Sequence, residues 1–367
     1  MGKADIDAFS DLIEATGLAS SVVYSTDLGR QLAGDSRHVL AKLPSESVDL
    51  IITSPPFSLL RKKTYGNEDQ DSYVAWLSDF GAAAKRVLKP TGSFVLDLGG
   101  AYQRSRPVRS LYNFRVLLDF CDRLGYELAE EFFWFNPAKL PSPIEWVNKR
   151  KIRAKDAVNT VWWFSKTDWP KANISNVLLP YSDRMKKLLE DPAKFYTPRG
   201  RPSGHDIAEG FGRDNGGAIP PNLLQIPNTD SNSFYLRTCK GLNRESHPAR
   251  FPSALPEFFI KFLTDPGDIV LDIFSGSNTT GFVAESLRRR WLSIELDHAY
   301  ACLSAIRFME GADASQVREA LEHIESGKHL AFQPGFPTSP NTVACAAPYQ
   351  GVLLVEETPA KYASRKL

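Results

Sequence analysis

The chain has 367 residues, is 43% hydrophobic and 24% charged, and carries a formal net charge of +1 at pH 7. These values are typical of a soluble globular protein with one large and one small domain, or with two domains of ordinary size. No apolar run approaches the length of a membrane span, and the first residues lack a signal-peptide pattern. The four cysteines form no CxxC pair, so we expect a cytoplasmic protein without disulfides or a metal.

The first part of the chain alternates strand-like and helix-like segments. Short runs of β-branched and apolar residues predict strands at 21–26, 48–53, 93–98 and 126–135. Apolar residues at helical spacing predict helices at 36–43, 72–89 and 108–125, and Pro90-Thr91-Gly92 should stop the second of these. Such alternation indicates a doubly wound, mostly parallel α/β sheet of Rossmann-like type, with helices on both faces.

From about residue 137 the pattern changes to a basic, proline-punctuated segment. It contains one strand-like run at 160–166 and a loop-like stretch at 196–232. Residues 139–250 hold nineteen Lys or Arg against eleven Asp or Glu, whereas the rest of the chain is net negative. This asymmetry favours a negatively charged partner, with nucleic acid as the first candidate, although a solvated basic face has the same composition.

Strand–helix alternation resumes in the last third of the chain. Strands are predicted at 268–274 and 290–296, and helices at 256–264, 279–289 and 298–310. We therefore predict one catalytic α/β domain built from residues 1–138 and 245–330, with an insertion at 139–244. Residues 331–367 are expected to form a poorly ordered tail, with at most a short strand at 351–356.

The strand at 48–53 runs into the tetrapeptide Ser54-Pro55-Pro56-Phe57. Two adjacent prolines remove two backbone N–H donors and fix two φ angles, so the corner is rigid and its carbonyls stay free to accept hydrogen bonds. Such a corner offers acceptors to a ligand without competing donors.

A second chemically loaded stretch is LDIFSGSNTTG, where a strand leads through a glycine-bearing loop into a helix. Glycine lets a ligand approach the backbone, and a helix N-terminus offers free N–H groups. Glu295 closes the next strand and is a candidate for binding ribose hydroxyls. The candidate ligand-binding residues of the loop are Asp272, Phe274, Gly276, Ser277, Asn278 and Thr279.

Asparagine (Asn278) stands in this loop where the dinucleotide motif GxGxxG, counted from Gly276 to Gly281, has its central glycine. A ligand with adenosine but no pyrophosphate therefore fits better than a nicotinamide dinucleotide, and S-adenosylmethionine is such a ligand. A plain strand–turn–helix with a capping residue is the alternative. Because ligands of open α/β sheets bind beyond the carboxyl ends of the strands, where strand order reverses, we expect the two loops to face each other across one crevice.

TSPPF followed much later by DIFSGSNTTG resembles the amino-group DNA methyltransferases of bacterial restriction–modification systems. Among these the chain is similar to the β class, in which the catalytic motif precedes the cofactor motif in a circularly permuted order. SPPF is typical of cytosine-N4 enzymes, whereas adenine-N6 enzymes mostly carry DPPY or NPPY. The resemblance covers about residues 25–310, including the run FNPAKLPSPIEWVNKRKIRAKDAVNTVWWFSK.

The resemblance implies methylation of the inner cytosine of CAGCTG in double-stranded DNA, with S-adenosylmethionine as cofactor and residues 139–244 as the DNA-recognition insertion. It also implies a bacterial, nucleoid-associated monomer that works alongside a restriction endonuclease without a stable complex. An adenine-N6 methyltransferase on the same fold and a non-catalytic DNA-binding protein are the alternatives.

The acceptor roles follow from the same resemblance. The Ser54 hydroxyl and the Pro55 carbonyl would hold the exocyclic amine, Pro56 would fix the corner, and Phe57 would stack on the flipped base. Asp97, at the end of the strand at 93–98, would offset positive charge developing on the amine, or would only cap a turn.

For the cofactor, the resemblance places Asp35 near the adenine, with a simple helix N-cap as the alternative. It assigns Arg250, Phe251, Pro252 and Ser253 to the methionine moiety.

The target base must leave the duplex, and the insertion is expected to support this by binding DNA. The residues expected to neutralise phosphates are Lys149, Arg150, Lys151, Arg153 and Lys155. Base reading is expected near residues 199–206, with Arg199, Arg201 and His205 as candidates, although a lone loop histidine is more often structural.

Overall fold

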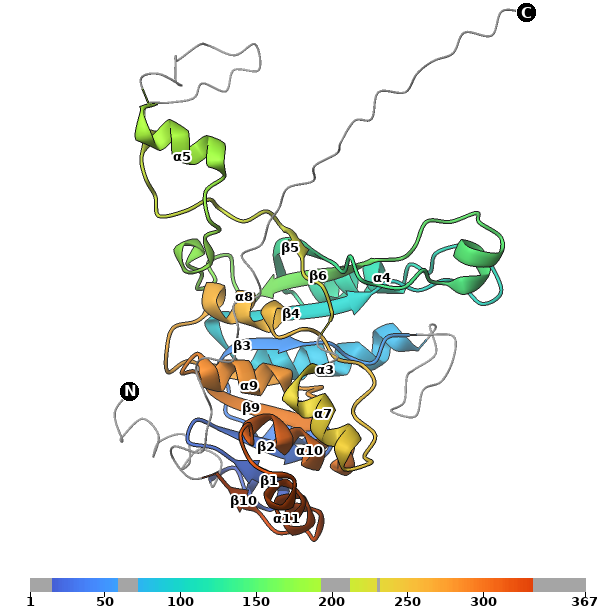
Figure 1. Ribbon diagram of the computed structural model, residues 1–367, viewed down its shortest axis with the longest axis vertical. Helices are drawn as coiled ribbons and strands as arrows, with labels where there is room; N and C mark the ends of the chain where they lie inside the picture. The colour runs from blue at the N-terminus through green and yellow to red at the C-terminus, as the bar shows by residue number, and fades with distance from the viewer. Residues whose placement is uncertain (1–14, 59–71, 193–211, 230–231, 333–367) are drawn as a thin grey trace, which may run out of the picture.

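A computed structural model of the chain describes residues 15–58, 72–192, 212–229 and 232–332 (Figure 1). A ten-stranded sheet runs through these residues in the order β10-β1-β2-β9-β8-β3-β4-β6-β5-β7. The strands are β1 (Val22–Ser25), β2 (Gly29–Ala33), β3 (Val48–Thr53), β4 (Leu88–Gly99), β5 (Glu127–Phe135), β6 (Val158–Ser165), β7 (Leu223–Gln225), β8 (Ile269–Asp272), β9 (Arg290–Glu295) and β10 (Leu330–Ala331).

The sheet is mostly parallel, as the sequence predicted. Its five central strands, β2, β9, β8, β3 and β4, are all parallel to their neighbours in that group. Antiparallel pairing occurs where β1 meets β2 and where β6 lies between β4 and β5. Central parallel strands are covered on both faces, which explains why β3 and β8 are buried along their whole length and are mostly apolar.

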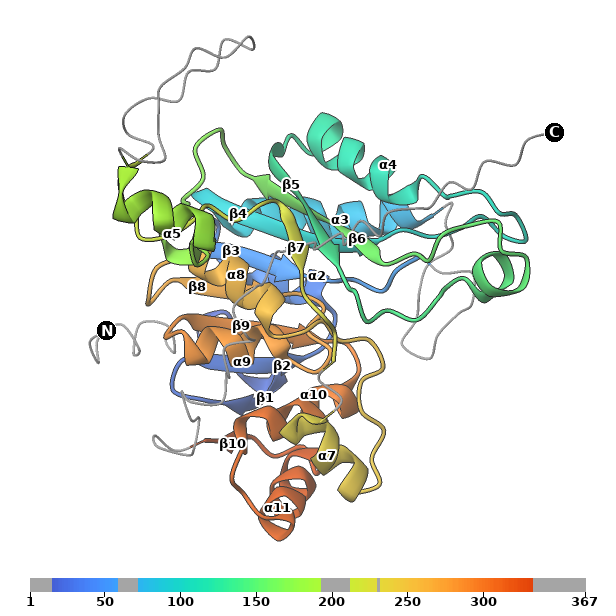
Figure 2. The ribbon, with the colours of Figure 1, turned by 45° about the horizontal axis from the view of Figure 1, so that its top comes forward.

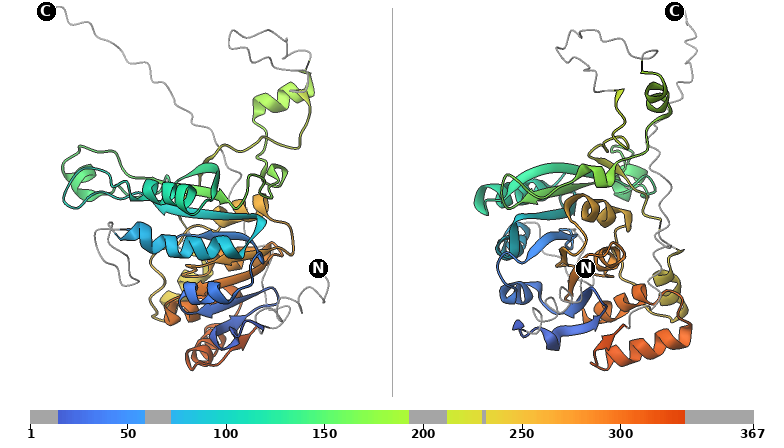
Figure 3. Two further views of the ribbon diagram at one scale, coloured as in Figure 1. Left: turned by 180° about the vertical axis from the view of Figure 1, so that it is seen from behind. Right: turned by 90° about the vertical axis from the view of Figure 1, so that its left-hand side faces the viewer.

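Helices cover both faces of the sheet, as Figure 3 shows in its right-hand view. The helices are α2 (Ser36–Lys42), α3 (Tyr73–Val87), α4 (Tyr112–Leu118), α5 (Asp183–Glu190), α7 (Phe234–Gly241), α8 (Ala254–Leu263), α9 (Thr279–Ser286), α10 (His298–Ser304) and α11 (Ala314–Glu325). One apolar core joins α2, α3 and α4 to the sheet, and a second joins α8, α9, α10 and α11 to the opposite face. No helix in the described ranges is long and apolar enough to cross a bilayer.

Residues 136–157 form an arm between β5 and β6. Because β5 runs in the same direction as β4, the arm leaves and rejoins the sheet at the edge where the central strands end. Residues 226–229 leave β7 at the same edge, and the described chain continues through α7 in residues 232–253 (Figure 1). By contrast, α5 has no buried residue and stands away from the sheet (Figure 2).

The predicted strand at 160–166 corresponds to β6, which lies inside the sheet although it falls within the predicted insertion. It pairs with β4 along its whole length, from Ser93↔Ser165 to Gly99↔Asn159. Trp162 and Trp163 on this strand are buried. The division into domains stays a prediction, with the qualification that residues 158–165 belong to the common sheet.

The junction after α3 differs from its prediction. Pro90-Thr91-Gly92 does not form a break between helix and strand, because β4 already begins at Leu88. The register of β3 and β4 shifts between Val48 and Leu50, so the tripeptide lies in a bulge. A bulge is one of the few places in a sheet that tolerate proline, since its N–H side needs no ladder partner there.

Several short elements escaped the sequence interpretation, namely β2, β7, β10, α5, α7 and α11. The signal for α11 was present, since Asp313 and Gln316 form a reciprocal capping box and Val317, Leu321 and Ile324 are its buried face. The predicted strand at 351–356 lies outside the described residues.

Candidate functional site

The two loops singled out in the sequence emerge from neighbouring strands. β3 and β8 pair in parallel, with Leu50 opposite Val270 and Ile51 opposite Leu271. The buried Asp272 joins their ends, because one carboxylate oxygen accepts from the Thr53 hydroxyl at 2.6 Å and the other from the Thr280 hydroxyl at 2.6 Å. The SPPF corner and the SGSNTTG loop therefore stand side by side.

A cleft of about 880 Å³ opens between these loops. This volume lies near the upper end of the usual range for small-molecule sites. Thirteen predicted site residues line it, and they are Asp35, Ser54, Pro55, Pro56, Phe57, Asp97, Arg250, Phe251, Phe274, Gly276, Ser277, Thr279 and Glu295. The predicted residues Asp272, Pro252, Ser253 and Asn278 are not part of the lining.

The SPPF corner presents acceptors to the cleft. The Ser54 hydroxyl donates to Oδ2 of Asp97 at 3.0 Å, so its lone pairs remain for a ligand. Pro55 has no N–H to compete with its own carbonyl. The Tyr73 hydroxyl donates a hydrogen bond to the Pro56 carbonyl at 2.9 Å, which fixes the far side of the corner.

Asp97 is a buried carboxylate with neutral partners. Besides Ser54, its other oxygen accepts from the Asn159 amide at 3.1 Å, and the residue is only 4% exposed. Burial is the largest cause that raises the pKa of Asp97, to about 6, and the two hydrogen bonds partly oppose it. The strand β4 thus holds a carboxylate behind the Ser54 hydroxyl at the floor of the cleft.

The ring of Phe57 lies against Gly99, the last residue of β4. A Cβ on Gly99 would stand 2.4 Å from the Phe57 ring, so any larger residue would displace that ring. Gly99 is itself held by the Tyr112 hydroxyl, which donates to its carbonyl. The aromatic ring is therefore kept in place at the wall of the cleft beside Ser54.

The other half of the cleft is built on Gly276. Its φ of +52° suits glycine, and its N–H donates to Oε2 of Glu295 at 2.7 Å. Oε1 of Glu295 accepts from the Asp297 N–H at 2.9 Å, and burial raises the pKa of this carboxyl. A Cβ on Gly276 would come within 3.0 Å of the His247 ring, so the loop has no room for a side chain there.

Asn278 supports this loop from below. Its own φ is +54°, its side chain caps α9 by accepting from the Gly281 N–H at 3.0 Å, and its amide donates to the Tyr24 hydroxyl at 2.9 Å. Asn278 is fully buried, and so is Asp272 to within 1%. In the structure both residues shape the loop and do not face the cleft.

Asp35 is the helix N-cap that the sequence offered as one interpretation, and its predicted place near the adenine stays a prediction. Its side chain caps α2 by accepting from the Arg37 N–H at 2.9 Å, and the residue also lines the cleft. The Arg37 guanidinium, bound to the same carboxylate, lowers the pKa of Asp35.

Three aromatic rings form a wall at this end of the cleft. Phe274 was predicted as a site residue, whereas Trp76 and Phe80 were not. The Phe274 ring lies 5.6 Å from Trp76 and 4.8 Å from Phe80, both on α3. Trp76 and Phe80 are one helical turn apart, a spacing that in the sequence is indistinguishable from that of ordinary core positions.

The predicted phosphate-binding residues lie on or beside the arm and not in the cleft. Lys149 and Arg150 pair with Glu145, and Arg153 donates to the Pro107 carbonyl. These groups are exposed, and exposed ion pairs contribute little energy, so a phosphate could replace their partners. Arg199, Arg201 and His205 lie outside the described residues.

Polar residues from three other segments also line the cleft and were missed in the sequence. Asn136 follows β5 directly and Asn159 lies in β6, so their side chains depend on pairings that a single sequence does not show. The others are Lys139, Ser142, Asp156, Asn228 and His247. Within the described residues no group of three or more His, Cys, Asp or Glu side chains is arranged to hold a metal ion.

Comparison with known proteins gives consistent matches. The profile of a family described as DNA methylase matches residues 48–305. The chain is 58% identical over 308 residues to the type II methyltransferase M.PvuII of Proteus hauseri, covering 84% of this chain and 92% of that protein. It is 27% identical to the type II methyltransferase M.SmaI of Serratia marcescens, covering 76% and 90% of the two chains.

A solved structure agrees with these matches. The PvuII DNA methyltransferase, described as cytosine-N4-specific, superposes with a TM-score of 0.70 at 48% identity. The match covers 85% of this chain and 97% of that chain.

Proposed function

The chain belongs to the DNA methylase family, and from that membership we propose that it methylates the N4 amine of a cytosine in double-stranded DNA. The proposed methyl donor is S-adenosylmethionine. The likeness to the cytosine-N4-specific PvuII enzyme supports the choice of base, and the SPPF form of the acceptor motif supports it independently.

The acceptor corner explains how the amine is held. The lone pair of a cytosine amine is delocalised into the ring, and attack on a methyl group needs that nitrogen to become more tetrahedral. The Ser54 lone pairs and the Pro55 carbonyl accept one N–H each, since the Ser54 proton is already engaged by Asp97. Phe57 stacks on the base, and Asp97 offsets the positive charge that develops on the nitrogen.

The residues of the second half of the cleft fit the proposed methyl donor. Glu295 is held by two backbone N–H groups, so its remaining lone pairs are available to ribose hydroxyls. Asp35 and Phe274 stand beside it for the adenosine part, and Arg250 and Phe251 line the other end. When bound, S-adenosylmethionine supplies an activated methyl group on sulfur.

Positioning accounts for most of the rate in this scheme. Holding a nucleophile and its target in line contributes up to roughly 7–11 kcal/mol in favourable cases. No strong base is needed beside the amine, because its proton becomes acidic once the methyl group has arrived. The base is presented to the cleft by rotation out of the duplex, at an unstacking cost of about a few kcal/mol.

The proposal includes a target sequence and a setting. We infer that the chain recognises CAGCTG and binds DNA with residues 139–244, which include most of the arm. The acceptor motif precedes the cofactor motif in this proposal, which is the permuted order. It would act as a monomer that protects DNA from a separate restriction endonuclease. Lys149, Arg150, Lys151, Arg153 and Lys155 would contact phosphates in this complex, without sequence preference.

The observation that carries the proposal is that two groups of residues line the same cleft. One is the proline corner with the Ser54–Asp97 pair, and the other is the Gly276 loop with Glu295. The test is to incubate a CAGCTG duplex with labelled S-adenosylmethionine, digest the DNA and identify the nucleosides. N4-methylcytosine that disappears with Ser54→Ala is expected. Labelled N6-methyladenine, or no transfer to DNA, would refute it.

A further inference from the structure

Asn136 has a side chain whose orientation is determined by its neighbours. It follows β5 at the start of the arm, and its Oδ1 accepts from two backbone N–H groups, those of Ala138 at 3.1 Å and Asn228 at 3.2 Å. A backbone N–H can only donate, so the side-chain atom that faces both groups must be the oxygen and not the nitrogen. Its Nδ2 must therefore point away from these two contacts.

The Nδ2 group makes no hydrogen bond to any described residue, while Asn136 lines the same cleft as Ser54 and Asp97. Asn136 is half-buried, and Nδ2 is not one of the buried side-chain atoms without a partner, so this group is accessible to solvent. An accessible amide on a residue that lines the cleft can offer two N–H donors to a ligand there.

The segment that carries Asn136 is held in place by further contacts. The Lys155 ammonium binds the carbonyls of Pro137 at 3.0 Å and Lys139 at 3.2 Å. The Trp134 indole N–H donates to the Ile226 carbonyl at 2.8 Å, which ties the end of β5 to the strand segment before Asn228. A fixed donor discriminates between ligands better than a mobile one, since it cannot turn away from a mismatch.

We propose that Asn136 reads the acceptor edge of the everted pyrimidine, donating to its O2 and N3 atoms while the SPPF corner holds N4. This inference rests on the proposed function. Cytosine carries the oxygen O2 on this edge, whereas adenine has a C–H at the equivalent place. A fixed donor there favours cytosine, because adenine keeps an acceptor (N1) at the place of N3 but leaves the N–H that would meet O2 facing a C–H group.

The test replaces Asn136 by Asp, which keeps the size of the side chain and the oxygen that binds Ala138 and Asn228. The carboxylate presents an acceptor to an acceptor, so we expect kcat/KM for a CAGCTG duplex to fall about 10–100-fold. The KM for S-adenosylmethionine and the Tm should remain close to those of the unmodified chain. In a duplex with adenine at the target position, kcat/KM should fall less, which lowers the preference for cytosine.

Asn228→Ala is the matched control. It removes the hydrogen bond from the Asn228 side chain to the Arg250 carbonyl (2.8 Å) but keeps the backbone N–H that binds Asn136. We expect its effect on the KM of S-adenosylmethionine to exceed its effect on base preference.

The inference is wrong if Asn136→Asp leaves kcat/KM for DNA unchanged, or if it changes only the KM of S-adenosylmethionine. Both outcomes differ from failure of the proposed function, which would show as the absence of N4-methylcytosine with the unmodified chain. Asn136→Ala provides a second variant without a charge, and an unaltered preference for cytosine over adenine in both variants would also refute it.

Discussion

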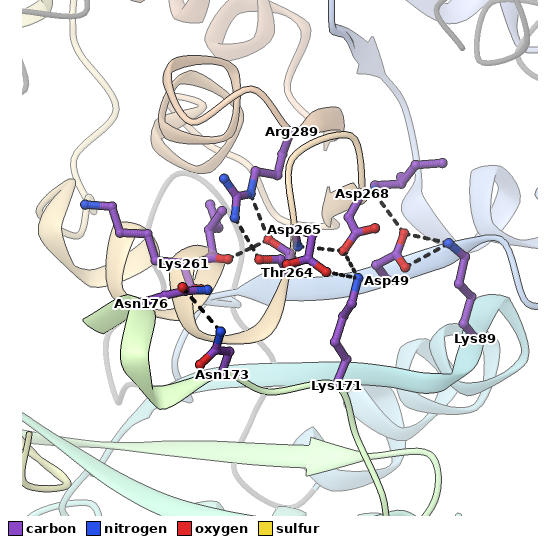
Figure 4. Close-up of polar contacts among 12 residues, drawn as sticks. Asp49, Lys89, Lys171, Asn173, Asn176, Lys261, Thr264, Asp265, Asp268 and Arg289 are labelled. Carbon is purple, nitrogen blue, oxygen red and sulfur yellow. Dashed lines mark hydrogen bonds and ion pairs between the residues drawn. The ribbon is translucent and has the colours of Figure 1, made fainter. Parts of the chain in front are cut away.

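Carboxylates have opposite surroundings at the two ends of the central strands. We call the side where the strands end the carboxyl edge and the side where they begin the amino edge. At the carboxyl edge, the partners of Asp97, Asp272 and Glu295 among the described residues are hydroxyl, amide and backbone groups, and burial raises the pKa of each. At the amino edge, the carboxylates are paired with lysines (Figure 4). The central strands thus begin among ion pairs and end beside carboxylates that form no ion pair with a described residue, although the charge of Lys139 opposes the rise in the pKa of Asp97.

The amino edge is a network of complementary charges. Asp49 at the start of β3 binds the Lys89 ammonium through both oxygens at 2.8 Å and also accepts from the Ile269 N–H at 2.9 Å. Lys171 joins Asp268 at 2.6 Å and Asp265 at 2.8 Å, and this pairing lowers the pKa of Asp265. These contacts connect three strands and the segment after β6.

The contrast indicates which edge is built for stability and which for binding. A buried carboxylate without a cation is costly to keep ionised, and structures retain such groups where a ligand needs them. At the amino edge the carboxylates have lysine partners within the chain, so keeping them ionised does not depend on a ligand. Substitutions at the two edges should therefore have opposite effects on stability and on activity.

The largest effect is expected from Asp97→Asn. An amide in this position would donate to Ser54, so the Ser54 proton would turn toward the cleft and meet an N–H of the cytosine amine. We expect kcat to fall about 10²–10³-fold, as when a charge-stabilising group is removed from an active site. Methyl transfer to a CAGCTG duplex under single-turnover conditions measures this.

Stability should change in the opposite direction in the same variant. An unfolding free energy at pH 7 equal to or above that of the unmodified chain is expected, because a buried charge is lost. A variant that loses activity together with stability would mean that Asp97 only supports the fold.

The sequence was sufficient to predict the central strands and the meeting of the two loops. Strands β3, β4, β8 and β9 contain mostly apolar, buried runs, and this signal comes from burial on both faces, which does not depend on partners far along the chain. The short β7 and β10 were missed because their pairing with distant strands, and not their composition, makes them strands.

The site was predictable where a motif is contiguous and unpredictable where it is assembled across the sheet. Ser54 and Gly276 lie in local patterns that carry their chemistry. Asn159 reaches Asp97 only because β6 pairs antiparallel with β4, and Asn136 is oriented by a residue 92 positions away. Asp272 and Asn278 were predicted to bind a ligand because they belong to the loop sequence; their side chains are buried on the distant partners Thr53 and Tyr24, which a single sequence does not show, and the ligand contact stays a prediction.

The pH dependence of stability offers a second comparison between the edges. The pKa of Asp97 is raised to about 6 in the folded chain, so the folded state holds its proton more tightly than the unfolded state, where an Asp pKa is about 3.9. Its contribution is therefore favourable below about pH 4 and is lost as the pH rises through 6. The loss amounts to about 3 kcal/mol.

Urea unfolding of the unmodified chain and of Asp97→Asn from pH 4 to pH 7 isolates this group. The variant should gain relative stability as the pH rises, and kcat of the unmodified chain should rise over the same range because the ionised form is the active one. A constant difference between the two proteins would contradict the raised pKa.

A smaller effect on stability, with none on activity, is expected from Asp49→Asn. The amide keeps an acceptor for the Ile269 N–H but leaves Lys89 without its partner. The Lys89 side chain is 35% exposed and can be partly hydrated, so the cost should be about 1–3 kcal/mol, below that of breaking a fully buried pair. Denaturant unfolding measures it, and kcat per folded molecule should change less than twofold.

The smallest effect is expected from Lys171→Met. Lys171 is about as exposed as Lys89, but its partner Asp265 is 61% exposed whereas Asp49 is 7% exposed, so water and salt screen more of the attraction. We expect a loss of about 0.2–1 kcal/mol that shrinks further in 1 M salt, while methyl transfer is unaffected. A loss of activity would mean that the amino edge influences the cleft through the strands, and the division of roles between the two edges would then be wrong. A loss of stability as large as that of Asp49→Asn would instead show that the two sets of ion pairs are energetically coupled. The hydrogen bond between Asp49 and the Ile269 N–H at the start of β8 connects them.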